Sequence, residues 1–207
     1  MKNPLPIAIF ASGGGTNFQA LLDYEDESSY RVDLLITDQK NAGVLERARK
    51  AGRRSEVLEH KGIMNQQQVS KMQTLLKACG IEFIALAGYL RKIPAAVVSG
   101  YPRRIVNIHP ALLPSFGGTG MYGKHVHQAV LKSGKKVTGP TVHYVDEDYD
   151  TGEIIAQVSV PVMKEDDFCS LENKVVKAEH LLYPAVVDQL CRALAEGRYP
   201  KNNETQC

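Results

Sequence analysis

Two polar side chains, those of Asn107 and His109, end a short apolar stretch near the middle of the chain. Residues 105–108 are rich in β-branched side chains, which is typical of a buried strand. Pro110 has no backbone N–H to donate, so the strand should end at His109. Residues two apart in a strand point to the same side of a sheet. The sequence therefore predicts an amide and an imidazole side by side at the carboxyl end of a strand, where open α/β sheets bind ligands.

An amide beside an imidazole is suited to acyl transfer. Asn107 can donate an N–H to the oxyanion of a tetrahedral intermediate, and His109 can do so when it is protonated. A nearby carboxylate would orient the imidazole and favour its charged form. Asp150 is the best candidate because it lies in a turn directly after an expected strand. The spacing alone fits equally well a turn capped by Asn107 and an ordinary buried histidine at position 109.

A glycine-rich stretch lies between an apolar strand at 7–11 and a helical pattern that begins near Phe18. It reads Ser12-Gly13-Gly14-Gly15-Thr16-Asn17. In such a loop, backbone N–H groups at a helix N-terminus bind phosphate, and glycines let the anion approach the backbone. The stretch lacks the Gly-Lys-Ser/Thr of a nucleoside-triphosphate loop. Phe18 replaces the third glycine of the dinucleotide pattern, although Asp38 resembles the acid that follows it. A tight turn with Thr16 as helix N-cap is the alternative.

Apolar strands alternate with helical patterns as far as residue 131, which indicates right-handed crossovers and a parallel sheet. The expected strands of this part are 7–11, 32–37, 57–58, 83–87 and 105–109. Two further strands, 141–145 and 154–160, are joined by a short acidic turn and must run antiparallel. The predicted fold is α/β: a single domain, residues 1–207, with a mostly parallel, Rossmann-like sheet flanked by helices and ending in an antiparallel strand pair. A last helix carries Glu179, and Pro184 is expected to kink or interrupt it.

Size and composition are those of one globular domain. The chain has 207 residues, of which 43% are hydrophobic and 23% charged, and these values are ordinary for a globular protein. A net charge of +2 gives no reason to expect a nucleic-acid partner. No apolar run reaches membrane-spanning length, and the first residues lack the apolar core of a signal peptide. We therefore expect a cytoplasmic protein with no membrane and no nucleic-acid partner.

Metal and hydrolytic chemistry are disfavoured by the spacing of the residues. Four histidines are candidate ligands, namely His109, His125, His127 and His143. His125-x-His127 lacks the zincin spacing, and no paired cysteines or Glu-x-x-His motif accompany it. The Gly-x-Ser-x-Gly turn of serine hydrolases is also absent. The sequence thus predicts no metal site.

A resemblance to a known family connects these motifs. The stretch Asn107-Ile-His109-Pro-Ala-Leu-Leu-Pro114 resembles the signature of folate-dependent formyltransferases, and residues 12–17 resemble the phosphate loop of the members that act on glycinamide ribonucleotide. Further matches lie at 45–48, 86–91, 139–152 and 178–180, so the resemblance spans nearly the whole chain. It implies transfer of a formyl group from 10-formyltetrahydrofolate, as co-substrate, to the amine of glycinamide ribonucleotide in purine biosynthesis.

The resemblance also implies roles for particular residues. Three match the catalytic residues: Asn107, His109 and Asp150. Six match residues that bind the ribonucleotide. Five of them match the loop that binds its phosphate, namely Gly13, Gly14, Gly15, Thr16 and Asn17. Glu179 matches the residue that positions the glycinamide. Five match the folate-contacting residues: Leu90, Arg91, Lys92, Ile93 and Asn107. The N-terminal half is then the ribonucleotide-binding half, and the C-terminal half binds folate and carries catalysis. We expect Asp150 to keep His109 protonated, and we expect a monomer or homodimer with two small-molecule substrates.

Some features depart from the pattern or fit other functions. The loop 116–124 is longer than in relatives, and the basic residue that relatives place near the folate tail has only Lys61 as a weak counterpart. Methionyl-tRNA formyltransferase and formyltetrahydrofolate deformylase carry an extra domain for which this chain has no room. An NAD-dependent oxidoreductase and a non-catalytic phosphometabolite-binding module are the alternatives from other classes.

Overall fold

A seven-stranded sheet forms the centre of the computed structural model, which describes residues 4–60 and 62–198. In chain order its strands are β1 (Leu5–Phe10), β2 (Tyr30–Thr37), β3 (Arg54–Val57), β4 (Phe83–Leu86), β5 (Ile105–His109), β7 (Thr141–Tyr144) and β8 (Ile154–Gln157). They lie in the order β3-β2-β1-β4-β5-β7-β8. The first five are parallel, whereas β7 is antiparallel to both β5 and β8. The predicted fold class is confirmed.

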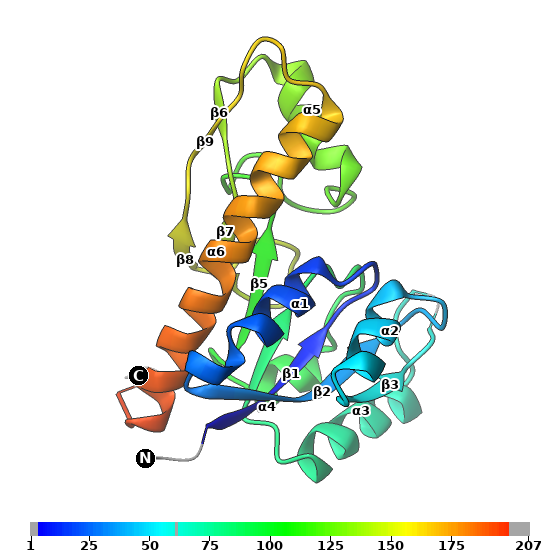
Figure 1. Cartoon of the computed structure of the whole chain (residues 1–207). Coiled ribbons are helices and arrows are strands. Elements are labelled where there is room, and N and C mark those ends of the chain that lie inside the picture. Colours follow the sequence, from blue (N-terminus) through cyan, green and yellow to red (C-terminus); the bar gives the residue numbers. More distant parts are fainter. Residues whose placement is uncertain (1–3, 61, 199–207) are drawn as a thin grey trace, which may run out of the picture.

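Helices cover both faces of this sheet (Figure 1). They are α1 (Thr16–Asp23), α2 (Gly43–Lys50), α3 (Gln66–Ala78), α4 (Ala95–Gly100) and α6 (Phe168–Ala195), whereas α5 (Lys124–Ser133) packs against α6 away from these faces. Helices α1, α2 and α6 pack with Ile7 and Ile9 of β1, and α3 and α4 pack with Ala8 and Phe10. Because both of their faces are buried, the central strands β1 and β4 are continuously apolar instead of alternating. Within the described residues, no helix combines the length and apolarity needed to cross a membrane.

The upper part of the molecule in Figure 1 contains α5, the start of α6 and a two-stranded sheet of β6 (Val137–Thr138) and β9 (Val160–Pro161). The predicted single strand 154–160 was wrong, because β8 ends at Gln157 and β9 pairs with β6 instead. The change of partner occurs beside Gly139, which has a φ of 143°. A Cβ at this position would lie 1.8 Å from the carbonyl oxygen of Val158, so only glycine allows the two segments to pass.

Two details at helix positions also differ from the predictions. Thr16 is the first residue of α1 and does not cap it; the N-cap is Gly15, whose φ is 73°. A Cβ on Gly15 would lie 2.5 Å from Val44, so the loop can turn here only because it lacks a side chain. Helix α6 continues through Pro184 without interruption, because buried residues before and after it, among them Val175 and Val187, hold the helix against the core.

Tyr183 fixes α6 against the sheet. Its side chain is completely buried, and its hydroxyl lies 2.8 Å from the carbonyl oxygen of Leu86 and 3.2 Å from that of Val106. Leu86 ends β4 and Val106 belongs to β5, so one hydroxyl connects the helix to two neighbouring strands. Glu179 lies one turn earlier on the same helix. The position of Glu179 relative to the strand ends therefore depends on this contact.

We expect Tyr183→Phe to lower the free energy of unfolding by roughly 1 to 2 kcal/mol, because it removes a buried hydrogen bond without creating a cavity. Urea denaturation followed by circular dichroism measures this change. Tyr149→Phe, at a 40% exposed tyrosine, is the matched control and should leave the unfolding midpoint unchanged. Equal midpoints for wild type and Tyr183→Phe would show that the helix is held by packing alone.

Candidate active site

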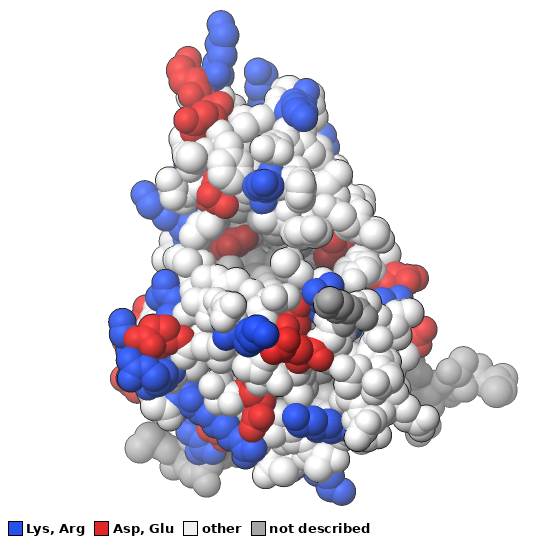
Figure 2. All heavy atoms as spheres, turned by 90° about the vertical axis from the view of Figure 1, so that its right-hand side faces the viewer, with Lys and Arg blue, Asp and Glu red and all other residues white. Residues whose placement is uncertain are grey.

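A cavity of about 640 Å³ opens where β4 and β5 end. Figure 2 shows the surface hollowed between the upper and lower parts of the molecule, with acidic side chains visible at the hollow. Nine of the candidate residues line this cavity: Asn17, Leu90, Arg91, Lys92, Ile93, Asn107, His109, Asp150 and Glu179. The other four, Gly13, Gly14, Gly15 and Thr16, form the loop just before Asn17. The fold thus brings residues from both halves of the chain to one cavity.

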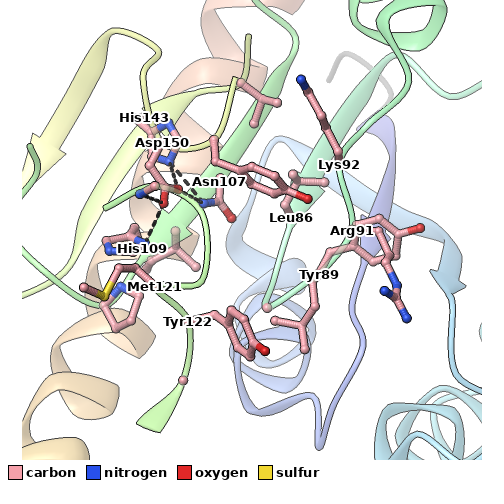
Figure 3. A pocket seen from close by; sticks show the side chains of 18 of the residues that line it. Leu86, Tyr89, Arg91, Lys92, Asn107, His109, Met121, Tyr122, His143 and Asp150 are labelled. Carbon is pink, nitrogen blue, oxygen red and sulfur yellow. Dashed lines mark hydrogen bonds and ion pairs between the residues drawn. The ribbon is translucent and has the colours of Figure 1, made fainter. Parts of the chain in front are cut away.

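Asn107, His109 and Asp150 meet on one wall of the cavity (Figure 3). The carboxylate of Asp150 has Oδ2 3.4 Å from His109 Nδ1 and Oδ1 3.5 Å from Asn107 Nδ2. The backbone N–H of Gly118 donates to Oδ2 over 3.0 Å. Asp150 itself has a φ of 58°, a conformation that non-glycine residues adopt rarely. The acidic turn after β7 is therefore held in an unfavourable conformation that aims this carboxylate at the strand end.

His143 is a site residue that sequence reasoning considered only as a metal ligand. It lies directly opposite Asn107 in the antiparallel pairing of β5 and β7. Its Nδ1 donates to the carbonyl of Tyr144 over 2.8 Å, and its Nε2 lies 3.1 Å from Asn107 Nδ2 and 3.5 Å from Asp150 Oδ1. The contact with Asn107 sets the orientation of the Asn107 amide. The signal was the position of His143 within the strand that precedes the acidic turn, but its partner depended on the strand register.

Burial and neighbouring groups together set the protonation states of His109 and Asp150. Burial lowers the pKa of His109, and the opposing effects of the Asp150 carboxylate and of the Phe116 carbonyl do not overcome it. Burial raises the pKa of Asp150, but His143, His109 and the Gly118 N–H together bring it below its ordinary value. The expectation that Asp150 keeps His109 charged is therefore wrong for the ligand-free site: the carboxylate is ionised and the imidazole is neutral at neutral pH.

The ring of His109 is nevertheless prepared to accept a proton. Its Nε2 lies 2.8 Å from the carbonyl oxygen of Phe116, and that distance requires a proton on Nε2. Nδ1 faces the carboxylate of Asp150. Because both nitrogens face acceptors, the imidazolium would satisfy both contacts once it forms. Among the described residues, no group of three or more His, Cys, Asp or Glu side chains has an arrangement that could hold a metal ion.

The glycine loop presents unpaired N–H groups at the start of α1. The carbonyl of Gly13 accepts from Val44 N–H over 3.1 Å, and the carbonyl of Gly14 accepts from Arg47 Nε over 2.7 Å. Within residues 4–60 and 62–198, no hydrogen bond uses the backbone N–H groups of residues 13–17. The carbonyls are bonded to α2, and the free N–H groups at the helix N-terminus have the arrangement that anions bind, which makes this loop a candidate anion site beside the cavity.

Asn17 connects this loop to α6 across the cavity. Its Nδ2 donates to Glu179 Oε2 over 2.8 Å, whereas its buried Oδ1 has no partner among the described residues. Glu179 is only 6% exposed. Burial raises the pKa of Glu179 to about 7, although the bond from Asn17 acts in the opposite direction. The Asn17 amide thus joins the glycine loop to the buried carboxyl group of Glu179 at the cavity wall.

The segment Leu90–Ile93 follows β4 and forms the opposite wall (Figure 3). Leu90 is 46% exposed, and Ile93 is buried in the core on the α3 and α4 face. Arg91 Nε donates to the carboxylate of Asp38 over 2.8 Å. In this structure the buried carboxylate of Asp38 is held by Arg91 and does not present the free oxygens that the ribose-binding role considered for it requires. Lys61, the weak candidate for the folate tail, lies outside the described residues.

Known proteins share this architecture and sequence. Residues 5–187 match the family model described as "Formyl transferase". The chain is 43% identical over 191 residues to a chloroplastic phosphoribosylglycinamide formyltransferase of Arabidopsis thaliana, covering 89% of this chain and 65% of the relative. It is 39% identical to the phosphoribosylglycinamide formyltransferase of Bacillus subtilis, covering 88% of this chain and 93% of the relative.

A solved structure agrees with these matches. The crystal structure of glycinamide ribonucleotide transformylase 1 from Geobacillus kaustophilus superposes with a TM-score of 0.83 at 40% identity, covering 91% of this chain and all of that one. The chain spans about two thirds (65%) of the length of its Arabidopsis relative, so only the shared part is compared there. From sequence and structure together, the chain belongs to the formyl transferase family.

Proposed function

We propose that the protein transfers the formyl group of 10-formyltetrahydrofolate to the amine of glycinamide ribonucleotide. The single observation that carries this proposal is the meeting of Asn107, His109 and Asp150 in a cavity that also borders an anion-binding loop. One substrate brings a phosphate and an amine, and the other brings a carbonyl at which an oxyanion forms. The cavity offers a complementary group for each. Relatives named for this reaction support the same conclusion.

In this proposal the phosphate binds the N–H groups of residues 13–17, which leads the ribonucleotide past Asn17 and Glu179 toward the catalytic residues. The folate lies against Leu90–Ile93 on the opposite wall. The N-terminal half of a single domain thus supplies the phosphate site, and the C-terminal half supplies the three catalytic side chains. Bringing the two substrates together in one cavity accounts for much of the rate, because it makes their reaction effectively intramolecular.

The chemistry begins when the neutral amine attacks the formyl carbon and the carbonyl oxygen becomes negative. The amide nitrogen of Asn107 lies 3.1 Å from His143 Nε2 and 3.5 Å from Asp150 Oδ1. The N–H that points toward Asp150 makes only this long contact, so in the proposed reaction it donates to the oxyanion. Neutral His109, whose Nε2 already carries a proton, takes the proton of the new ammonium group at Nδ1 through a water, because Nδ1 faces Asp150. Its imidazolium, between Asp150 and the Phe116 carbonyl, then protonates the folate nitrogen as the bond from the formyl carbon breaks.

Incubation with 10-formyltetrahydrofolate tests the proposal directly. We expect loss of the formyl-folate absorbance only when glycinamide ribonucleotide is present, with formation of the formylated ribonucleotide detected by mass spectrometry. Release of formate without any amine would instead identify a deformylase. Consumption of NAD with a hydroxy compound would indicate an oxidoreductase. Binding of either substrate without turnover would support a non-catalytic binding module.

Asp150→Asn should lower kcat by about 100- to 10,000-fold, because the imidazolium of His109 loses the charge that stabilises it. Both substrates should still bind within a few-fold of wild-type affinity, since neither depends on this carboxylate for its main contacts. Single-turnover kinetics and isothermal titration calorimetry measure the two quantities. Asp148→Asn, at an exposed aspartate of the same turn, is the control. Near-normal turnover of Asp150→Asn would remove the carboxylate from this role.

Glu179→Gln should make the protein more stable at pH 8 and less able to bind the ribonucleotide. The folded-state pKa of Glu179, about 7, lies above its ordinary value of 4.5. The folded protein therefore holds a proton that the unfolded chain has lost, and stability falls as pH rises from 4.5 through 7. Glutamine removes this penalty, which at pH 8 is on the order of 3 kcal/mol.

Urea denaturation at pH 5 and pH 8 measures the effect of Glu179→Gln. The gain over wild type should be small at pH 5 and largest at pH 8. Glu165→Gln, at an exposed glutamate just before the same helix, is the control and should show no such pH dependence. A gain that is equal at the two pH values would contradict ionisation of a buried Glu179.

A further inference from the structure

Asp38 is a buried carboxylate that the proposed chemistry does not use. It follows β2, and its side chain is fully shielded from solvent. Its Oδ1 accepts from the hydroxyl of Ser12 over 2.5 Å, and its Oδ2 accepts from Arg91 Nε over 2.8 Å and from Gln39 Nε2 over 2.7 Å. Burial raises the pKa of this carboxyl, but these three donors bring it below its ordinary value, so it is ionised at neutral pH.

Two of these donors, Ser12 and Arg91, belong to segments far from Asp38 in the sequence. Ser12 is the first residue of the glycine loop, directly before the N–H groups that form the candidate anion site. Arg91 belongs to the segment that forms the opposite wall. The hydroxyl of Ser12 also accepts the N–H of Leu90 over 2.9 Å, and the N–H of Ser12 donates to Gly88 over 3.0 Å. One serine and one aspartate therefore connect the two halves of the cavity.

We propose that Asp38 is a positioning residue that couples the two substrate sites, so that occupation of one site favours binding at the other. This inference rests on the proposed function. A displacement of either loop would leave an ionised carboxylate buried with fewer donors, which is strongly unfavourable. A ligand that holds the glycine loop in place therefore also holds Arg91 in place. The converse follows because coupling between two binding sites is reciprocal.

The coupling is measured by isothermal titration calorimetry with glycinamide ribonucleotide and tetrahydrofolate as probes. For the wild type, saturating tetrahydrofolate should tighten ribonucleotide binding by about 5-fold or more, and the reverse experiment should give the same factor. In Asp38→Asn the side-chain oxygen can still accept from Ser12, but an NH₂ group replaces the oxygen that accepts from Arg91. Two donors then face each other, and the bond to Arg91 is lost. The coupling factor should then fall to about unity.

Two further variants make the outcome specific. Ser12→Ala removes the link from the other side and should also abolish coupling, which keeps the test valid if Asp38→Asn fails to fold. Asp188→Asn is the matched control, because Asp188 is an equally buried aspartate that binds Arg192 and the Ser29 N–H away from the cavity. It should keep the wild-type coupling factor even if the protein loses stability.

A second readout separates coupling from a local structural role. Loss of coupling should raise the KM of both substrates in Asp38→Asn, with a smaller change in kcat, whereas damage to one wall would raise one KM only. Independent binding in the wild type, unchanged coupling in Asp38→Asn, or loss of coupling in Asp188→Asn would each overturn the inference. The proposed function is tested separately. It stands if the wild-type protein transfers the formyl group, whatever the coupling measurements give, and it is rejected if the wild-type protein transfers none.

Discussion

The antiparallel pairing of β7 with β5 is the contact on which the candidate active site depends. It sets His143 opposite Asn107, and it returns the chain so that the following turn places Asp150 against the same strand end. Tyr144, the last residue of β7, lies opposite Val106, so the chain leaves β7 toward the amino end of β5 and the turn must fold back to bring Asp150 to Asn107 and His109. The register of this strand pair and the turn that follows it therefore bring a second imidazole and a carboxylate to the amide and imidazole of β5.

The site consists of ionisable groups whose charges are set by different balances of burial and partners. Asp150 has enough donors to remain ionised despite its burial, whereas burial outweighs the carboxylate for His109. Glu179 has one amide donor and is close to half-protonated at neutral pH. Groups held in this way can exchange protons with little change in structure. This arrangement suits a reaction in which a proton leaves one nitrogen and reaches another.

Buried polar contacts also connect segments outside the reacting residues. Asp38 connects the glycine loop to the segment after β4, and Tyr183 connects α6 to the ends of β4 and β5. Both are buried polar contacts between segments that are far apart in sequence. They hold the cavity walls at a fixed separation, which apolar packing alone would specify less sharply. A few buried hydrogen bonds between distant segments thus fix the positions of the cavity walls, and an apolar core surrounds them.

Local sequence patterns were sufficient to predict the fold class and most of the strands, and they named residues that the structure places at one cavity. Continuous apolar runs indicated buried parallel strands, the position of Pro110 located the end of β5, and the glycine loop before α1 indicated an anion site. These features are determined by residues within a few positions of one another, through strand periodicity, the missing N–H of proline and the missing side chain of glycine. A resemblance to a known family identified Asp150 and Glu179 more firmly than spacing did.

Only the tertiary structure decided how these residues act on one another. The partner of His143 depended on strand register, the division of 154–160 into two strands depended on the approach of Gly139 to Val158, and the occupation of Asp38 depended on Arg91, 53 positions away. The protonation of His109 was predicted wrongly because a sequence shows which charges are available but not how deeply they are buried. Burial and long-range pairing arise from the packed chain as a whole, so no local pattern of residues contains them.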